Sequence, residues 1–175
     1  MPKTLSDRPA ANRDHSFELL EQLQTRERYL EALADIHRRL LECAPTDDLY
    51  AVVLPPLLEA SQADRVYVFE NSTGPDGGLR TSQMAEIVAD GVEPQIGNPQ
   101  LKDVPLEPGF RRWLTLLRAG EPVTGAVSGF PDPERAILEP QGIRSLLVLP
   151  LIVENDLFGF IGFDDCRDDK PWDAA

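Results

Sequence analysis

The sequence predicts an α+β fold in which a long N-terminal helix precedes a compact domain that contains a sheet. Residues 14–44 contain neither glycine nor proline, and their leucines recur at three- and four-residue steps, as in an amphipathic helix. Residues 64–71 change to a strand pattern, and residues 145–163 form two apolar runs around a polar turn. The chain of 175 residues is long enough for one domain with one core.

The composition argues against several classes of partner. The chain has 17 lysine and arginine residues against 30 aspartate and glutamate residues, which gives a formal net charge of −13. Because such a surface repels phosphate backbones and anionic headgroups, we expect neither nucleic acid nor a membrane surface as a partner. The sequence has no apolar run near the roughly 20 residues that span a bilayer and no N-terminal signal segment, so we expect a cytoplasmic protein.

The N-terminal region divides into a tail and a helix. Residues 1–13 include two prolines and little that could pack, so we expect a flexible tail. A helix over 14–44 would be about 45 Å long, which is more than a domain this small can cover. We therefore expect it to project and to pair with a second copy of the chain, although a helix that lies on its own domain would show the same pattern. The expected pairing residues are Leu23, Leu30, Leu33, His37 and Leu40.

The compact domain is expected over residues 45–175. It begins with a second helix, in which Pro55 and Pro56 predict a kink or a restart. The strand over 64–71 has bulky residues at successive positions, which predicts a central strand covered on both faces. A glycine-rich turn then leads to a more polar strand over 79–88, for which we expect an edge position.

The middle of the domain is irregular. Residues 89–108 contain four prolines, and a loop of this length in a compact domain is usually functional or mobile. A short helix over 110–119, a short strand over 122–127 and a brief helix that begins at Asp132 are expected to follow.

The last part of the domain gives the clearest pattern. The apolar runs 145–153 and 157–163 predict a hairpin that is buried on both faces. Gly159 and Gly162 in its second strand indicate close approach of another element. The acidic residues in 164–169 are interpreted as a solvated loop.

Residues that carry common catalytic chemistry are sparse in this sequence. His15 and His37 are its only histidines, and they lie too far apart to share a metal on one helix face, so we expect no metal site, no haem ligand and no histidine base in the domain body. Cys43 and Cys166 are its only cysteines, and the carboxylates near Cys166 would raise its pKa. We therefore expect no catalytic residue.

Aromatic residues around the irregular region are the candidates for a binding site. Phe110, Trp113 and Phe130 could enclose a small ligand, and Arg112 and Arg144 lie close to them in the sequence. If the arginines point inward, an anionic ligand is expected, because guanidinium groups match carboxylate and phosphate. The alternative, that Phe110 and Trp113 only fix a short helix to the sheet, is equally open.

Three stretches of the sequence resemble a GAF domain of the type found in bacterial sensor histidine kinases and hybrid kinases. Residues 63–70 look like its first strand, residues 143–151 with 159–164 like its closing hairpin, and residues 172–175 like the opening of its terminal helix. The resemblance implies a PAS-related antiparallel sheet of five or six strands with helices on both faces, and a terminal helix that is truncated here.

The same resemblance implies a regulatory role. GAF modules bind small molecules or dimerise, and they pass a signal through their terminal helices to an output domain, which here would lie outside the chain. The sequence lacks the cyclic-nucleotide motif of one subgroup, the body cysteine and histidine of bilin-binding members and the pocket cysteines of the free methionine-sulfoxide reductases. We therefore expect a non-catalytic sensory module without bilin or haem. A ligand-free dimerisation platform and, less favoured, a cysteine-dependent redox enzyme remain alternatives.

Overall fold

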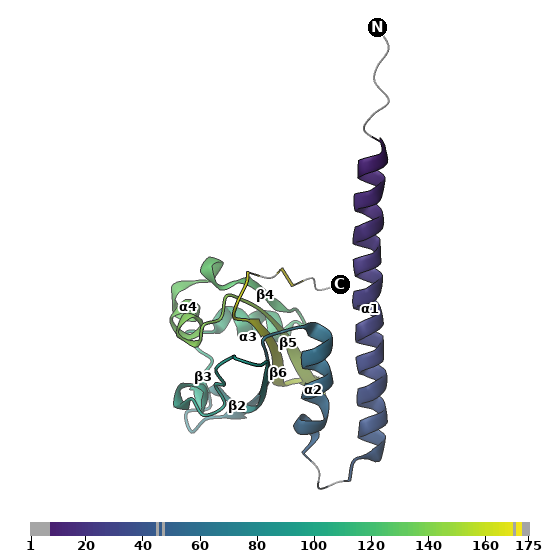
Figure 1. The fold of residues 1–175 in the computed structure, drawn as a ribbon. Helices are drawn as coiled ribbons and strands as arrows, with labels where there is room; N and C mark the ends of the chain where they lie inside the picture. Colours follow the sequence, from purple (N-terminus) through teal and green to yellow (C-terminus); the bar gives the residue numbers. More distant parts are fainter. Residues whose placement is uncertain (1–7, 45, 47, 170, 173–175) are drawn as a thin grey trace.

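A computed structural model of the chain describes residues 8–44, 46, 48–169 and 171–172. A long helix lies beside a domain that is built on a six-stranded antiparallel sheet (Figure 1). The helices are α1 (Arg8–Glu42), α2 (Leu49–Ser61), α3 (Arg111–Arg118) and α4 (Asp132–Leu138), with the 3-10 turns η1 (Pro99–Leu101), η2 (Val127–Gly129) and η3 (Glu139–Gln141). The strands are β1 (Arg65–Thr73), β2 (Leu79–Val88), β3 (Val104–Pro105), β4 (Val123–Ala126), β5 (Ser145–Val153) and β6 (Asp156–Asp165).

The sheet has the strand order β3-β2-β1-β6-β5-β4, so β1 and β6 occupy its centre. Each face carries its own hydrophobic core. On one face α2 packs through Leu54 against Val66, Val68 and Phe163 of the central strands. On the other face α3, α4 and the irregular segment between β2 and α3 pack over a larger core. This arrangement confirms the α+β fold, with an antiparallel sheet covered by helices on both faces.

Helix α1 is longer than the sequence predicted. It begins at Arg8, so residues 8–13 are helical and do not belong to a tail, while residues 1–7 lie outside the described residues. Figure 1 shows that its C-terminal part lies beside α2 and that its N-terminal part extends past the domain. In the described part of the chain no helix is long and apolar enough to cross a membrane.

Helix α2 is continuous through its two prolines. Its N-cap is Asp48, whose carboxylate accepts hydrogen bonds from the backbone N–H groups of Tyr50 at 3.0 Å and Ala51 at 3.4 Å. The restart expected at Pro55 and Pro56 is wrong, because the helix runs unbroken from Leu49 to Ser61. Burial of its apolar side against the sheet outweighs the backbone hydrogen bonds that the prolines cannot donate.

The β5–β6 hairpin lies where the sequence placed it, with Glu154 and Asn155 at positive φ in its turn. Its turn end is not buried, because Ile152 and Val153 are 46% and 54% exposed. Strand β2 is close to an edge position, since its outer neighbour β3 has only two residues.

The two glycines of β6 mark close approaches, as predicted. A Cβ atom added at Gly159 would lie 2.0 Å from the carbonyl oxygen of Phe69 on β1. A Cβ atom at Gly162 would lie 2.2 Å from Cζ of Tyr67. The ring of Tyr67 therefore occupies the space that only glycine leaves free at this position.

Candidate ligand-binding site

A cavity of about 50 Å³ lies between the sheet and its cover of short helices and loops. Five aromatic and six aliphatic side chains form its apolar lining. The rings of Phe69 and Phe160, on the neighbouring strands β1 and β6, stack with their centroids 4.9 Å apart. The rings of Phe110 and Trp113 meet edge to face at 5.1 Å, and Trp113 also contacts Phe160 at 6.1 Å. The strands and the cover thus share one aromatic cluster.

A buried ionic cluster forms the polar end of this cavity. Arg65, one of the lining residues, lies 3.4 Å from the carboxylate of Asp164 and 3.5 Å from that of Glu86. These three side chains are at most 1% exposed. The sheet register brings them together, because Arg65 of β1 pairs with Asp164 of β6 on one side and with Val88 of β2 on the other.

Arg65 and Glu86 also hold the cover of the cavity to the sheet. The Nη2 of Arg65 donates to the backbone carbonyls of Glu93 at 3.2 Å and Gln141 at 3.3 Å, which belong to two separate cover segments. The carboxylate of Glu86 accepts from the backbone N–H groups of residues 95–96, at 2.7 and 2.8 Å. Movement of this cluster would therefore move both cover segments.

Burial sets the protonation of the groups around Arg65. Desolvation raises the pKa of Asp164 to about 7, although the Arg65 charge and a hydrogen bond from Tyr67 at 3.0 Å act to lower it. Burial, followed by the charge of Asp164, places the pKa of Tyr67 well above its usual range. Burial also raises the pKa of the Cys166 thiol to about 11, a larger cause than the neighbouring carboxylates that the sequence suggested. A thiol with this pKa is a poor nucleophile near neutral pH.

Gln83 of β2, like Arg65, is a lining residue with a buried side-chain atom that has no hydrogen-bond partner among the described residues. Its Nε2 donates to Glu86 Oε1 at 3.1 Å, which fixes the orientation of the amide. Its Oε1 is buried and has no hydrogen-bond partner in the described part of the chain. A buried acceptor without a donor costs about 1–3 kcal/mol. The cavity therefore presents an acceptor that a bound molecule could satisfy.

Two of the five predicted pocket residues, Phe110 and Trp113, line the cavity. Arg112 lies outside this lining, where it donates to Glu134 at 3.0 and 2.5 Å and stacks 4.7 Å over the ring of Phe130. Arg144 is exposed and reaches the loop after β6. The inward orientation considered for these two arginines is therefore wrong.

The residues at the polar end were missed by sequence reasoning. Asp164 was assigned to a solvated acidic loop, but it is fully buried, and its neighbour Asp165 is only 8% exposed. A usable signal was present: Arg65 is a charged residue directly before the apolar run of residues 66–69. Such a residue in a central strand needs a buried partner.

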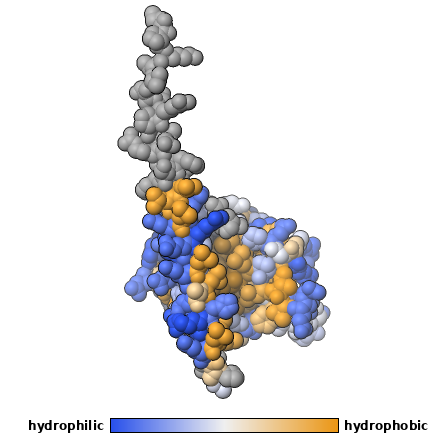
Figure 2. Space-filling view, turned by 90° about the vertical axis from the view of Figure 1, so that its right-hand side faces the viewer, coloured by the Kyte–Doolittle hydropathy of each residue, from blue (hydrophilic) through white to orange (hydrophobic). Residues whose placement is uncertain are grey.

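A second candidate site is the outer side of α1. The pairing residues predicted from the sequence are all exposed, with Leu23 at 59%, Leu30 at 67%, Leu33 at 56% and Leu40 at 40%. We call these four leucines the leucine face. Figure 2 shows apolar patches along α1 on this side of the molecule.

The opposite side of α1 is the one that is covered. Its partly buried residues are small or polar for the most part: Thr25, Arg28, Ala32, Asp35 and Ile36. Helix α1 therefore turns a more polar side to its own domain and leaves its leucines exposed, which is the reverse of an ordinary surface helix.

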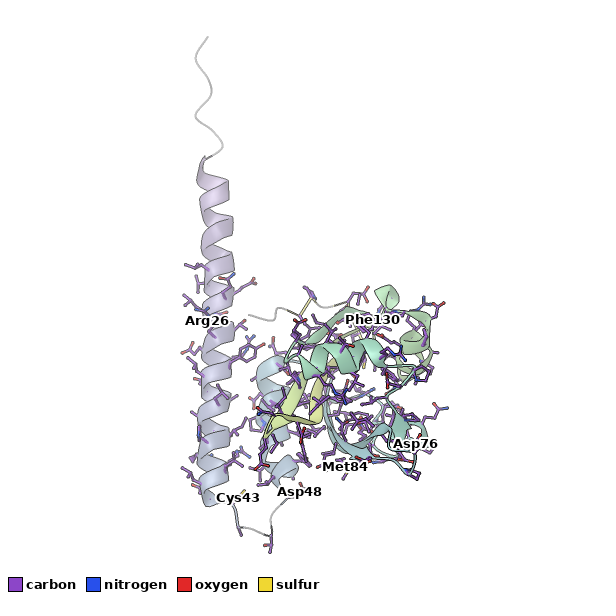
Figure 3. The ribbon with its side chains drawn as sticks, turned by 180° about the vertical axis from the view of Figure 1, so that it is seen from behind. Arg26, Cys43, Asp48, Asp76, Met84 and Phe130 are labelled. Carbon is purple, nitrogen blue, oxygen red and sulfur yellow. The ribbon has the colours of Figure 1, made fainter. Side chains whose placement is uncertain are left out.

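Cys43 lies far from the cavity. Figure 3 shows it at the C-terminal end of α1, where the chain turns towards α2, while the cavity lies across the sheet from α2. Neither Cys43 nor Cys166 belongs to the lining of the cavity.

A sheet with α2 and α1 on one side, and a cavity enclosed by short helices and loops on the other, defines a class of α+β domain that can hold a small molecule against its sheet. The chain belongs to the GAF domain family, whose family model matches residues 45–175. The resemblance read from the sequence is thereby confirmed.

One known protein has a sequence similar to most of this chain. The methanogenesis regulatory histidine kinase FilI of Methanothrix harundinacea (strain 6Ac) is 43% identical over 151 residues, which are 86% of this chain and 17% of that protein. The chain thus corresponds to a small part of this relative. The chain is similar to part of a regulatory histidine kinase, as the sequence suggested.

Solved structures agree with the fold. The phycocyanobilin-bound GAF domain from a cyanobacterial phytochrome has a TM-score of 0.64 at 16% identity over 82% of each chain. The blue-light-absorbing form of the PixJ GAF domain of Thermosynechococcus elongatus has a TM-score of 0.52 at 24% identity over 67% of each chain. At these identities the likeness concerns the fold alone.

Proposed function

We propose that the chain is the non-catalytic sensory module of a regulatory histidine kinase. In this proposal a small molecule binds in the cavity, and the state of the domain passes through α1 to an output domain elsewhere in the protein. Support comes from the GAF family match and from the 43% identity to a regulatory histidine kinase. A bound molecule can shift the domain only if it binds one of two arrangements more tightly than the other.

The cluster around Arg65 could transmit a change at the cavity to α1. It touches the cavity and ties two cover segments to β1, β2 and β6. The opposite face of β1 and β6 packs on α2, and α1 lies against α2. A change at the cavity that alters the pairing of Arg65 therefore has contiguous packed elements between itself and α1.

We further propose that two copies of the chain pair through α1. The observation that carries this is the exposure of the leucine face, whose apolar side chains are otherwise left in water. A groove of about 420 Å³ adjoins this face, between Leu33 of α1, Leu57 of α2 and Leu149 of β5. Exposed apolar patches of this kind mark interaction sites, and a helix of a second copy presents a matching surface.

We propose that the chain holds no bilin, although solved relatives bind such pigments. The cavity of about 50 Å³ is far below the roughly 300–1,000 Å³ of pockets that hold drug-sized ligands. Neither cysteine lies in the cavity lining, and residues 45–165 of the sequence contain no cysteine or histidine. These residues do not fit a covalently attached tetrapyrrole.

Sedimentation equilibrium tests the pairing of α1. The wild-type chain of 19.4 kDa should show the mass of two chains at micromolar concentrations. Leu30→Glu should give the mass of one chain, because it places a charge in the centre of the leucine face. Gln24→Glu, which adds the same charge at an exposed position of α1 outside the leucine face, should leave the larger mass unchanged. A wild-type chain that stays monomeric would refute the pairing.

A further inference from the structure

The polar groups at the cavity determine what kind of molecule it can hold, and this inference rests on the proposed sensory function. The cation at the cavity, Arg65, is already matched by Asp164 and Glu86 and by two backbone carbonyls. An anionic ligand would have to displace one of these carboxylates and would meet the charge of the other. The cavity is therefore unsuited to the anion that the sequence suggested.

Two other polar lining residues, Thr81 and Gln141, use side-chain donors in hydrogen bonds to backbone carbonyls. Thr81 donates through Oγ1 to the carbonyl of Glu70 at 3.3 Å. Gln141 donates through Nε2 to the carbonyl of Ile137 at 2.7 Å. Two buried atoms of lining residues have no hydrogen-bond partner in the described residues: Nε of Arg65 and Oε1 of Gln83, whose side chain is 1% exposed. Nε of Arg65 faces the carboxylate of Glu86 at 3.5 Å, so Oε1 of Gln83 is the atom left without an opposite charge or donor. A matching ligand therefore supplies a hydrogen-bond donor.

Size and lining restrict the ligand further. An apolar cavity of about 150 Å³ holds benzene, so a cavity of about 50 Å³ admits a molecule of only a few heavy atoms. Because aromatic and aliphatic side chains together form most of the lining, the rest of that molecule is apolar. We propose that this cavity binds small uncharged molecules that carry a hydroxyl or amide donor on a short apolar body, with Gln83 Oε1 as the acceptor that selects them.

Three probes of nearly equal size test whether the cavity prefers a hydrogen-bond donor, an acceptor alone or an anion. 2-Propanol has an apolar body and a hydroxyl donor, acetone has the same skeleton with an acceptor alone, and acetate is the anionic analogue. Each is titrated into the intact chain while the NMR signals of the Gln83 side-chain amide and the Trp113 indole N–H are followed. Both groups belong to residues that line the cavity.

We expect saturable shifts with 2-propanol in the millimolar range, and binding at least tenfold weaker for acetone and for acetate. Gln83→Leu, which keeps the approximate size and removes the acceptor, should abolish the preference for 2-propanol over acetone. Gln24→Leu, the same change on the exposed side of α1, should retain it. The comparison of probes in the wild-type chain decides the question even where Gln83→Leu does not fold.

Equal binding of acetone and 2-propanol, or tighter binding of acetate, would overturn the proposal. NMR shifts that grow linearly with the concentration of every probe would also overturn the proposal. They would indicate that no probe binds at a saturable site and that the Gln83 acceptor bonds to water. Any of these results together with a chain that pairs through α1 would refute the ligand class and leave the proposed sensory module standing. A monomeric chain that nevertheless prefers 2-propanol would support the ligand class and refute the pairing through α1.

Discussion

The guanidinium of Arg65 and the carboxylate of Asp164 lie 3.4 Å apart in the centre of the sheet, where water does not reach them. Their strands pair them directly, so the contact is a consequence of the β1–β6 register. Ion pairs of this kind add little net stability, but removal of one partner leaves an uncompensated buried charge. The protonation of Asp164 should therefore affect both the stability of the domain and the hydrogen bonds from Arg65 to the cover segments.

Replacement Asp164→Asn should flatten the pH dependence of stability. Folding raises the pKa of Asp164 from 3.8 to about 7, so the folded state binds the proton more tightly than the unfolded state. This contribution is fully present below the unfolded pKa and is lost as the pH rises through the folded pKa. Urea unfolding at a series of pH values should show the advantage of wild type over the variant shrinking from about pH 4 to about pH 7. Parallel pH profiles would contradict this assignment.

Gly162→Ala should destabilise the domain. The added methyl group would lie 2.2 Å from Cζ of Tyr67. The Tyr67 ring, whose hydroxyl donates to Asp164, therefore has to move. A loss of about 1–3 kcal/mol in the free energy of unfolding is expected. Gly97→Ala is the matched control, because a Cβ atom there meets nothing within 4 Å, and it should change stability by less than about 0.5 kcal/mol. Equal effects of the two substitutions, measured by denaturant unfolding, would contradict the close packing.

Glu134→Gln should loosen the aromatic wall of the cavity. The Glu134 carboxylate is 2% exposed and accepts from Trp113 Nε1 at 2.8 Å as well as from Arg112. The variant should lose about 1.5–3 kcal/mol, as expected for hydrogen bonds to a charged group, and the fluorescence of Trp113 should change. Glu139→Gln breaks an exposed pair with Arg135 and should change stability much less, because exposed ion pairs add little. An unchanged tryptophan spectrum in Glu134→Gln would argue against this role.

The sequence was sufficient for the elements whose patterns are local. The successive bulky residues of β1 and the two apolar runs of β5 and β6 predicted the centre of the sheet, and the glycines at 159 and 162 predicted its close contacts. The length of α1 was underestimated at its start, because Pro9 was interpreted as part of a tail. Proline is tolerated in the first turn of a helix, where its missing donor would have no partner.

The candidate site was predicted only in part, for a physical reason. Phe110 and Trp113 could be found because they are large aromatic residues at one side of a short helix. Arg65, Gln83 and Asp164 come from three different strands, and only the pairing register brings them together. Sequence proximity also misled the assignment of Arg144, which lies next to the hairpin but points to its exposed end loop.

The account depends most on the claim that the leucine face of α1 is an interface between two copies of the chain. The concentration dependence of unfolding tests it directly, because a dimer that dissociates on unfolding is stabilised by mass action. Over a roughly hundredfold range of chain concentration, the urea midpoint of the wild type should rise, while that of Leu30→Glu should stay constant. A wild-type midpoint that does not change with concentration would show that the leucine face contributes no interface, and it would contradict the account.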